Sequence, residues 1–301
     1  MRGLSRAGRT LALVARRPGG AFGLLVIGLV VVLALVDDRL VPGGPNQVAV
    51  SDRLLGPSPQ HAFGTDQLGR DVLERVVLGA STSLQVGFVA VGIALVAGVL
   101  VGLLAGYYRG PLDAVLMRCM DVLFAFPAIL MAIAVLALLG PGTRNAMIAI
   151  GVVYVPIFAR VTRAAVLSVS EEVYVRASRS VGAPDVRILL SHVLPNAAPS
   201  IIVQTSVSLA FAILSEAALS FLGLGTQPPN SSWGYMLSDG RGFIEQAWWM
   251  AFFPGFAIFL TVLAFNLLGD ALRDVLDPRR RSLMAAGSTG SAGERPGVSG
   301  G

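Results

Sequence analysis

The amino-acid sequence predicts an all-α polytopic membrane protein with six transmembrane helices. Of its 301 residues, 54% are hydrophobic and 14% are charged, whereas soluble proteins carry about 25% charged residues. The mean hydropathy is +0.71. A helix needs about 20 apolar residues to cross the hydrocarbon core of a bilayer. Six apolar runs approach or exceed this length, the shorter ones with the help of tilt or flanking residues: 21–36, 84–106, 115–139, 145–159, 197–222 and 247–268.

The first apolar run, 21–36, follows a basic stretch and precedes two aspartates. It is typical of a retained membrane anchor, although a cleaved signal peptide has a hydrophobic region of similar length. We expect the anchor, with residues 1–20 as a cytoplasmic tail and 37–83 as an extracytoplasmic segment. Four polar residues of that segment either fold it on itself or meet a partner: His61, Asp66, Arg70 and Asp71.

The second apolar run contains Gly98, Gly102 and Gly106 at intervals of four residues. Residues four apart lie on one helix face, and small residues there let another backbone approach closely. The pattern predicts a helix-packing seam. The partner helix could belong to this chain or to another subunit.

The third and fourth runs contain Pro127 and Pro156, which are expected to kink their helices. Arg118 and Asp121, near the inner end of the third run, have the spacing of an i, i+3 ion pair. The tryptophans are expected in an aromatic belt at the outer membrane surface: Trp233, Trp248 and Trp249.

Glu216 lies well inside the fifth apolar run. Burying a carboxylate costs several kcal/mol unless it is paired or faces water. Glu216 therefore either forms part of a polar pathway wall or subunit contact, or makes a structural hydrogen bond. Ser215 and Asn266 are the other polar candidates for a pathway wall or subunit contact.

All 23 basic residues are arginines, so the chain lacks the lysine of a P-loop and is not a P-loop ATPase by itself. With the N-terminus in the cytoplasm, most arginines fall on the cytoplasmic side. The positive-inside rule therefore predicts that both termini are cytoplasmic. The basic excess reflects this topology and gives no support to nucleic-acid binding. The arginines left outside are Arg39, Arg53, Arg70, Arg75, Arg144 and Arg241.

The longest cytoplasmic connection between spans, 160–196, has the pattern of two short helices. Ser170 can cap a helix whose first turn holds two glutamates. Gly182 fits the position after that helix, and Pro184 fits the first turn of a second helix that runs to Pro195. The pattern indicates a helix, Gly, Pro, helix elbow in the cytoplasm. An ordinary loop with two surface helices fits the pattern equally well.

The segment RASRSVGAPDVRILLSHVLPN, Arg176 to Asn196, resembles the EAA loop of binding-protein-dependent ABC importer permeases. Arg176 stands where that pattern has Glu, and His192 where it has Ile. The resemblance implies that this loop couples the chain to ATPase subunits. The coupling residues it implies are Arg176, Ala177, Ser178, Gly182, Ala183, Pro184, Asp185, His192, Leu194 and Pro195.

Three further segments resemble the C-type permease subunits of dipeptide, oligopeptide and nickel importers. They are His61–Leu84, Phe124–Leu130 and Ser215–Leu237. The resemblance extends from about residue 20 to 281. It implies a type I (MetI-like) importer core at 84–281, an extra N-terminal helix, and a disordered cytoplasmic tail at 282–301.

The resemblance implies a non-catalytic, multi-pass subunit of the cell membrane that forms half of a translocation pathway. Its implied partners are a second, homologous permease, two ATPases that use ATP and Mg²⁺, an external binding protein and the membrane lipids. No cofactor or metal is expected on this chain. The implied substrate is a di- or oligopeptide or a related small ligand, with nickel or another non-peptide ligand as the alternative.

Two other function classes are weaker alternatives. A self-sufficient secondary transporter needs internal repeats and mid-membrane polar groups, and Glu216 alone supports it. An intramembrane hydrolase lacks support because H-E-x-x-H does not occur, and the one G-x-S-x-G, at 297–301, lies in the Gly/Ser-rich end of the sequence and not in an apolar run. One cysteine excludes an internal disulfide, and His61 and His192 are too far apart in sequence for a local metal pair.

Overall fold

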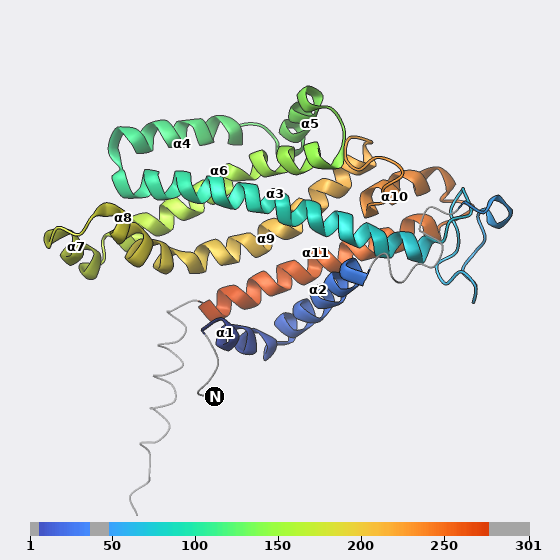
Figure 1. Ribbon diagram of the computed structural model, residues 1–301, viewed down its shortest axis with the longest axis horizontal. Coiled ribbons are helices and arrows are strands. Elements are labelled where there is room, and N and C mark those ends of the chain that lie inside the picture. The colour runs from blue at the N-terminus through green and yellow to red at the C-terminus, as the bar shows by residue number, and fades with distance from the viewer. Residues whose placement is uncertain (1–5, 37–47, 277–301) are drawn as a thin grey trace, which may run out of the picture.

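The computed structural model describes residues 6–36 and 48–276, and nearly all of the regular structure in them is helical. Most of the helices run roughly side by side along the long axis of the molecule (Figure 1). In chain order they are α1 (Arg6–Ala15), α2 (Pro18–Val36), α3 (Val72–Tyr108), α4 (Gly110–Phe124), α5 (Ala128–Leu139), α6 (Thr143–Ser170), α7 (Val173–Ser180), α8 (Asp185–Ile188), α9 (Leu194–Phe221), α10 (Trp233–Gly240) and α11 (Trp249–Leu276).

Five helices in the described ranges are long and apolar enough to cross a membrane, and α4 and α5 together make a sixth candidate that is bent by 90°. This agrees with the six predicted spans. Several helices extend beyond their apolar runs: α3 begins at Val72 rather than at residue 84, and α6 continues to Ser170 rather than ending near 159.

The core of the bundle lies where α3, α6 and α9 meet. Helices α2 and α11 cover one side of these three, and α4 and α5 lie on the other (Figure 1). The two ends of the bundle differ. We call the end that carries α7 and α8 the elbow end, and the end that carries α10 the α10 end.

The seam between α3 and α6 is built on the three glycines spaced four apart. A Cβ atom at Gly98 would lie 2.4 Å from the Phe158 Cβ, and one at Gly102 would lie 2.5 Å from the Ala159 carbonyl oxygen. A Cβ at Gly106 would come within 2.9 Å of Val166. The packing partner of this glycine face is therefore α6 of the same chain.

At the α10 end, the segment before α3 folds on itself. The His61 Nδ1 lies 2.9 Å from the Asp71 carboxylate, and the Arg70 Nε donates to Asp66 at 2.6 Å. Asp71 also caps α3 by accepting from the backbone N–H groups of Leu73 and Glu74. These contacts match the self-folded alternative for this segment.

The expectation of a tryptophan belt is wrong for two of the three residues. Trp233 and Trp249 are buried. Their indole N–H groups donate to the backbone carbonyls of Val76 at 2.8 Å and Thr65 at 3.0 Å. Buried tryptophans find hydrogen-bond partners in this way, and here Trp233 ties α10 to α3, while Trp249 ties α11 to the segment before α3. Trp248 is half exposed.

Candidate functional site

The elbow is a pair of short helices, α7 and α8, joined at Gly182. Gly182 has a φ of +77°, in the left-handed region that glycine adopts most readily. Its N–H donates to the Arg179 carbonyl at 3.0 Å, and the Ala183 N–H donates to the Ser178 carbonyl at 3.2 Å. This pair of bonds is the Schellman motif, which ends a helix sharply. Gly182 is thus required for the turn between the two helices.

Three details of the predicted elbow differ in the structure. Ser170 does not cap α7, because α6 continues through it and buries it; Glu172 is the N-cap residue instead. Pro184 is the N-cap residue of α8 rather than its first residue.

The third difference is the end of the second helix. It does not stop at Pro195, because α8 passes through a π-helical turn at Leu189–Val193 directly into α9. A π-helical turn changes the backbone hydrogen-bond pattern of a helix. Here it lies just before Pro195, which has no backbone N–H to donate. The elbow is therefore continuous with a transmembrane helix.

The elbow is attached firmly to the bundle. Val175, Ile188 and Val193 are fully buried in a cluster with Tyr107 of α3 and Val166 of α6. This cluster joins both elbow helices to the ends of two long helices. The elbow and those helix ends are therefore expected to move together.

Polar contacts reinforce this attachment. The Tyr107 hydroxyl donates to the Asp185 carboxylate at 2.6 Å, and the Arg179 guanidinium lies 4.9 Å from the centre of the Tyr107 ring. The Arg109 guanidinium donates to Glu171. This bond holds the pKa of the Glu171 carboxyl below its ordinary value.

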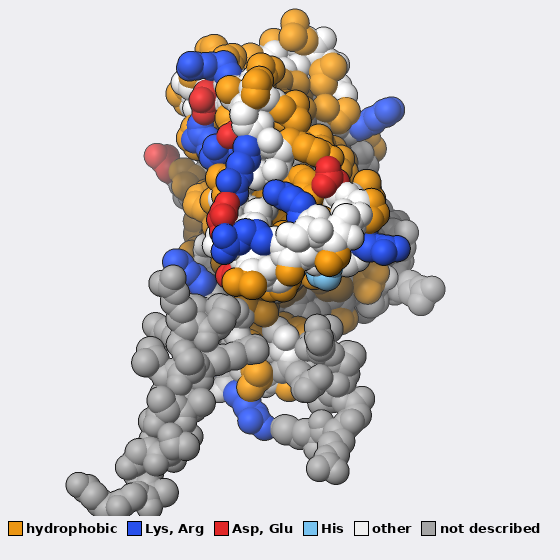
Figure 2. Space-filling view, turned by 90° about the vertical axis from the view of Figure 1, so that its left-hand side faces the viewer, with side chains coloured by type: hydrophobic (Ala, Val, Ile, Leu, Met, Phe, Trp, Pro, Cys, Tyr) orange, Lys and Arg blue, Asp and Glu red, His pale blue; other side chains and the backbone are white. Residues whose placement is uncertain are grey.

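The outer face of the elbow exposes apolar side chains. Val181 is 83% exposed, Val173 is 73% exposed and Val186 is 65% exposed. Figure 2 looks at the elbow end, where arginine side chains lie among apolar ones. Exposed apolar side chains on a firmly held projection form a surface suited to docking another protein.

The other predicted coupling residues lie on or beside this surface. Arg176, Ala177, Pro184 and Pro195 are exposed, whereas Ser178, Ala183 and Leu194 are partly buried. The partly buried His192 ring packs edge-on against Tyr174, with ring centres 6.1 Å apart.

Glu216 lies inside the bundle and is 1% exposed. Its carboxylate accepts a hydrogen bond from the Ser220 hydroxyl at 2.6 Å and longer ones, both 3.4 Å, from Thr226 and Ser83. Ser83 belongs to α3, and Thr226 to the loop after α9. The contacts of Glu216 therefore correspond to the structural alternative, because a pathway wall needs an exposed group.

The other two candidate pathway residues also bond within the chain. Ser215 shares a hydrogen bond of 3.2 Å with the Tyr154 hydroxyl of α6. The Asn266 amide donates to the Val262 carbonyl of its own helix at 2.9 Å.

The bend between α4 and α5 centres on residues 125–127 and includes Pro127, so the predicted kink is present. A cavity of about 450 Å³ lies beside it. The aromatic residues that line this cavity come from three helices and the bend: Phe124, Phe126, Tyr154 and Phe211. Tyr154 and Phe211 were missed by sequence reasoning, since apolar positions within spans carry no marker of a cavity.

Helix α4 is held against α6 by ion pairs. Arg163 donates two hydrogen bonds of 2.6 Å to Asp113, the bidentate geometry that favours strong arginine–carboxylate pairs. Asp121 accepts from Arg160 at 2.8 Å. The predicted pairing of Asp121 with Arg118 is therefore wrong, because α6 lies alongside α4 and supplies a better-placed partner.

No group of three or more His, Cys, Asp or Glu side chains in the described ranges is arranged to hold a metal ion.

Comparison with known proteins agrees with this description. The family described as "Binding-protein-dependent transport system inner membrane component" matches residues 98–282. The dipeptide transport system permease protein DppC of Alkalihalophilus pseudofirmus is 48% identical over 260 residues, which cover 86% of each chain. The glutathione transport system permease protein GsiD of Escherichia coli O6:K15:H31 is 48% identical over 256 residues, covering 85% of this chain and 84% of the relative.

A solved structure shares the fold. The inward-facing MetNI methionine ABC transporter contains a chain that is 19% identical, with a TM-score of 0.57. The match covers 67% of this chain and 96% of that one. Together with the helical architecture and the elbow, these matches establish that the chain belongs to the binding-protein-dependent inner membrane component family and is a non-catalytic permease subunit of an ABC importer.

Proposed function

We propose that this permease imports di- or oligopeptides and receives the movement of two ATPase subunits through its elbow. The observation that carries the proposal is the elbow itself, which exposes Val173, Val181 and Val186 on one side and is bonded to the bundle on the other. A surface of this kind transmits a rigid-body movement, because the load passes directly into α3, α6 and α9.

The peptide assignment is supported by relatives whose names state it. Besides the dipeptide permease above, the di/tripeptide permease DppC of Pseudomonas aeruginosa is 44% identical over 274 residues, covering 89% of this chain and 90% of the relative. Nickel or another non-peptide ligand remains the alternative substrate, since an external binding protein selects what is delivered. ATP and Mg²⁺ are used by the ATPase partners.

The bent span is the pair of helices α4 and α5. We propose that the face of the chain that carries this span lines the pathway and meets a second permease. Irregular backbone at membrane depth is tolerated only where protein or a water-filled cavity covers it. Residues 124–128 are exposed on the surface of this chain. Lipid cannot hydrogen-bond the irregular backbone at residues 124–128. A second permease and the water-filled pathway between the two chains would cover it instead.

The elbow end is proposed to face the cytoplasm, where ATPases are found. Helix α1 and the last turn of α11 lie near that end (Figure 1), and an ion pair joins Arg17 to Asp274 there. Both termini are then cytoplasmic, in agreement with the distribution of arginines.

The coupling proposal is tested with a matched pair of glycines. Gly182 and Gly223 have φ values of +77° and +78°, and no neighbouring atom lies within 4 Å of a Cβ built at either position. Gly182→Trp and Gly223→Trp therefore introduce similar backbone strain, but only the first changes the elbow surface. The measurement is ATP-dependent uptake of a labelled dipeptide by the reconstituted complex with its binding protein.

We expect Gly182→Trp to lower uptake by about tenfold or more, since blocking one well-packed docking contact costs at least ~1.4 kcal/mol. Gly223→Trp should retain most of the uptake, and both variants should insert into membranes. Normal coupled uptake by Gly182→Trp contradicts the coupling role. Uptake of Ni²⁺ but not of dipeptides by the unmodified complex favours the alternative substrate.

A further inference from the structure

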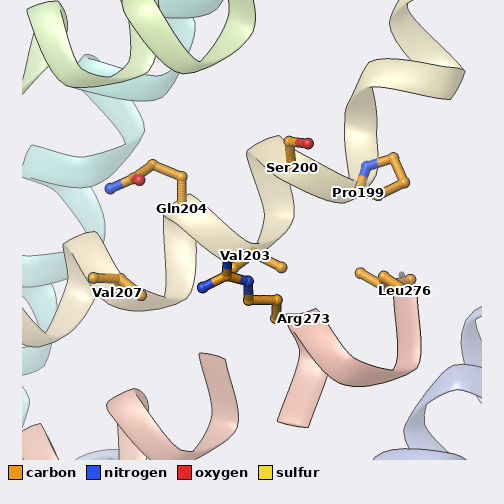
Figure 3. A pocket seen from close by; sticks show the side chains of 7 residues that line it. All are labelled: Pro199, Ser200, Val203, Gln204, Val207, Arg273 and Leu276. Carbon is orange, nitrogen blue, oxygen red and sulfur yellow. The ribbon is translucent and has the colours of Figure 1, made fainter. Parts of the chain in front are cut away.

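A cavity of about 460 Å³ lies between α9 and α11 near the elbow end. It is separate from the elbow surface and from the bent span. Figure 3 shows α9 on one side of the cavity and the last turns of α11 on the other. Its lining residues are Pro199, Ser200, Val203, Gln204, Val207, Arg273 and Leu276.

The cavity has a polar part and an apolar part. Arg273, Gln204 and Ser200 supply a guanidinium, an amide and a hydroxyl group. The remaining wall is apolar, with Val203, Val207 and Leu276 among its residues. A ligand that matches both parts has an oxygen-rich anionic head and a hydrocarbon tail.

The guanidinium of Arg273 is exposed at this cavity. No hydrogen bond or ion pair of Arg273 occurs in the described part of the chain, and the carboxylate of the adjacent Asp274 is engaged by Arg17. Gln204 donates one of its two amide N–H groups to the Ser208 hydroxyl at 3.1 Å. A guanidinium in an open, partly apolar cavity favours a phosphate, whose oxygens can accept two of its N–H groups at once.

The position of the cavity favours the headgroup of a membrane lipid as the phosphate-containing ligand. Arg273 lies in the last turn of a transmembrane helix, and only 28% of the apolar window of that helix is buried within this chain. Under the proposed topology, on which this step rests, the last turn of α11 lies at the inner leaflet. Basic cavities between helices at that depth bind anionic lipid headgroups.

We propose that the cavity is a binding site for an anionic phospholipid of the inner leaflet. The phosphate is held by Arg273 with the help of Gln204 and Ser200, and the start of an acyl chain lies against Val203 and Val207. The lipid then bridges α9, which is continuous with the elbow, to α11, which packs on α2.

The test compares lipid retention by the full-length chain and its variants after extraction into detergent. The probes are phosphatidylglycerol and, as the zwitterionic reference, phosphatidylcholine, each counted by native mass spectrometry. Arg273→Gln removes the charge. Ser200→Asp leaves Arg273 in place but adds a negative charge at an exposed position of the wall. Arg118→Gln is the matched control, because Arg118 is an exposed arginine of α4 outside the cavity.

We expect both cavity variants to retain about fivefold less phosphatidylglycerol than the unmodified chain, with Arg118→Gln unchanged and phosphatidylcholine retained weakly by all. Equal retention by Arg273→Gln and the unmodified chain overturns the proposal. An equal loss in Arg118→Gln also overturns it, because the effect is then one of net charge. So does displacement of the retained lipid by a dipeptide, which assigns the guanidinium to a substrate carboxylate.

The topology is tested independently of the lipid. Ser191→Cys in a Cys119→Ser chain places one thiol at an exposed position of the elbow end. A membrane-impermeant maleimide should label it in inside-out vesicles and not in right-side-out vesicles. Labelling from the outer side refutes the proposed orientation, whereas the detergent measurement still reports on the binding of the phospholipid to Arg273.

Discussion

Glu216 illustrates how a single charged residue is accommodated inside an apolar helix. Three hydroxyl groups surround its carboxyl, from α3, from α9 itself and from the loop that follows α9. A buried polar group costs little when it is hydrogen-bonded and a great deal when it is not. Glu216 thus links three parts of the bundle at one point.

This role predicts different outcomes for two substitutions. Glu216→Ala leaves the hydroxyls of Ser83, Ser220 and Thr226 without their acceptor, and should lower the unfolding free energy by about 2–4 kcal/mol. Glu216→Gln keeps one acceptor oxygen and adds an N–H that can donate to Ser83, so its effect should stay within about 1 kcal/mol. Unfolding titrations of the detergent-solubilised chain measure both. Unaltered stability of Glu216→Ala with lower peptide uptake would instead support a pathway role.

At the scale of helices, the contact between α3 and α6 depends on the absence of side chains. The backbones approach so closely at Gly98 and Gly102 that a single added carbon atom overlaps backbone atoms of α6. In a membrane, apolar side chains gain little by leaving lipid, so close packing of backbones becomes a main source of helix association.

The same helix contains a control position. Gly102→Ala places a Cβ 2.5 Å from the Ala159 carbonyl oxygen and should destabilise the chain by about 1–3 kcal/mol. No atom lies within 4 Å of a Cβ at Gly92, so Gly92→Ala should be neutral or stabilising by up to ~1 kcal/mol. Thermal unfolding in detergent distinguishes them. Equal melting temperatures of the Gly102→Ala and Gly92→Ala variants would contradict this prediction, because α6 would then accommodate the added methyl group without a loss of stability.

For the molecule as a whole, the important connection is that between the elbow and the bundle. Under the proposed coupling, the continuity of α8 with α9 carries movement along one helix. The Tyr107 hydroxyl and the buried cluster around Val175 carry it to α3 and α6. Several independent connections make the elbow and the helix ends a single body, which a switching subunit requires.

Removing one connection should reduce coupling without preventing assembly. Tyr107→Phe loses the hydrogen bond to Asp185, a bond to a charged acceptor worth about 1.5–3 kcal/mol, but keeps the buried ring. We expect less peptide transported per ATP hydrolysed by the reconstituted complex. Tyr108→Phe is the control, because Tyr108 is half exposed and the structure shows no hydrogen bond from its hydroxyl among the described residues. An unchanged transport ratio for Tyr107→Phe would exclude this contact from coupling.

Features that depend on local sequence were predicted well. The number of spans follows from apolar runs, the turn at Gly182 follows from the need for a left-handed residue, and the kink follows from Pro127. Positions of partners were predicted poorly. Asp121 pairs with Arg160 and not with Arg118, and two tryptophans point into the protein, because both outcomes depend on which helix lies alongside.

The sequence by itself determined that the chain spans a membrane, that it carries no P-loop, and that residues 160–196 contain two short helices joined at Gly182. These properties follow from hydropathy, from the absence of lysine and from local backbone preferences. Only the tertiary structure decided that α6 fills the glycine face of α3, that Glu216 is satisfied inside the bundle, and that Arg273 faces a cavity. Each of these depends on atoms brought together from distant parts of the chain, whose proximity no local preference encodes.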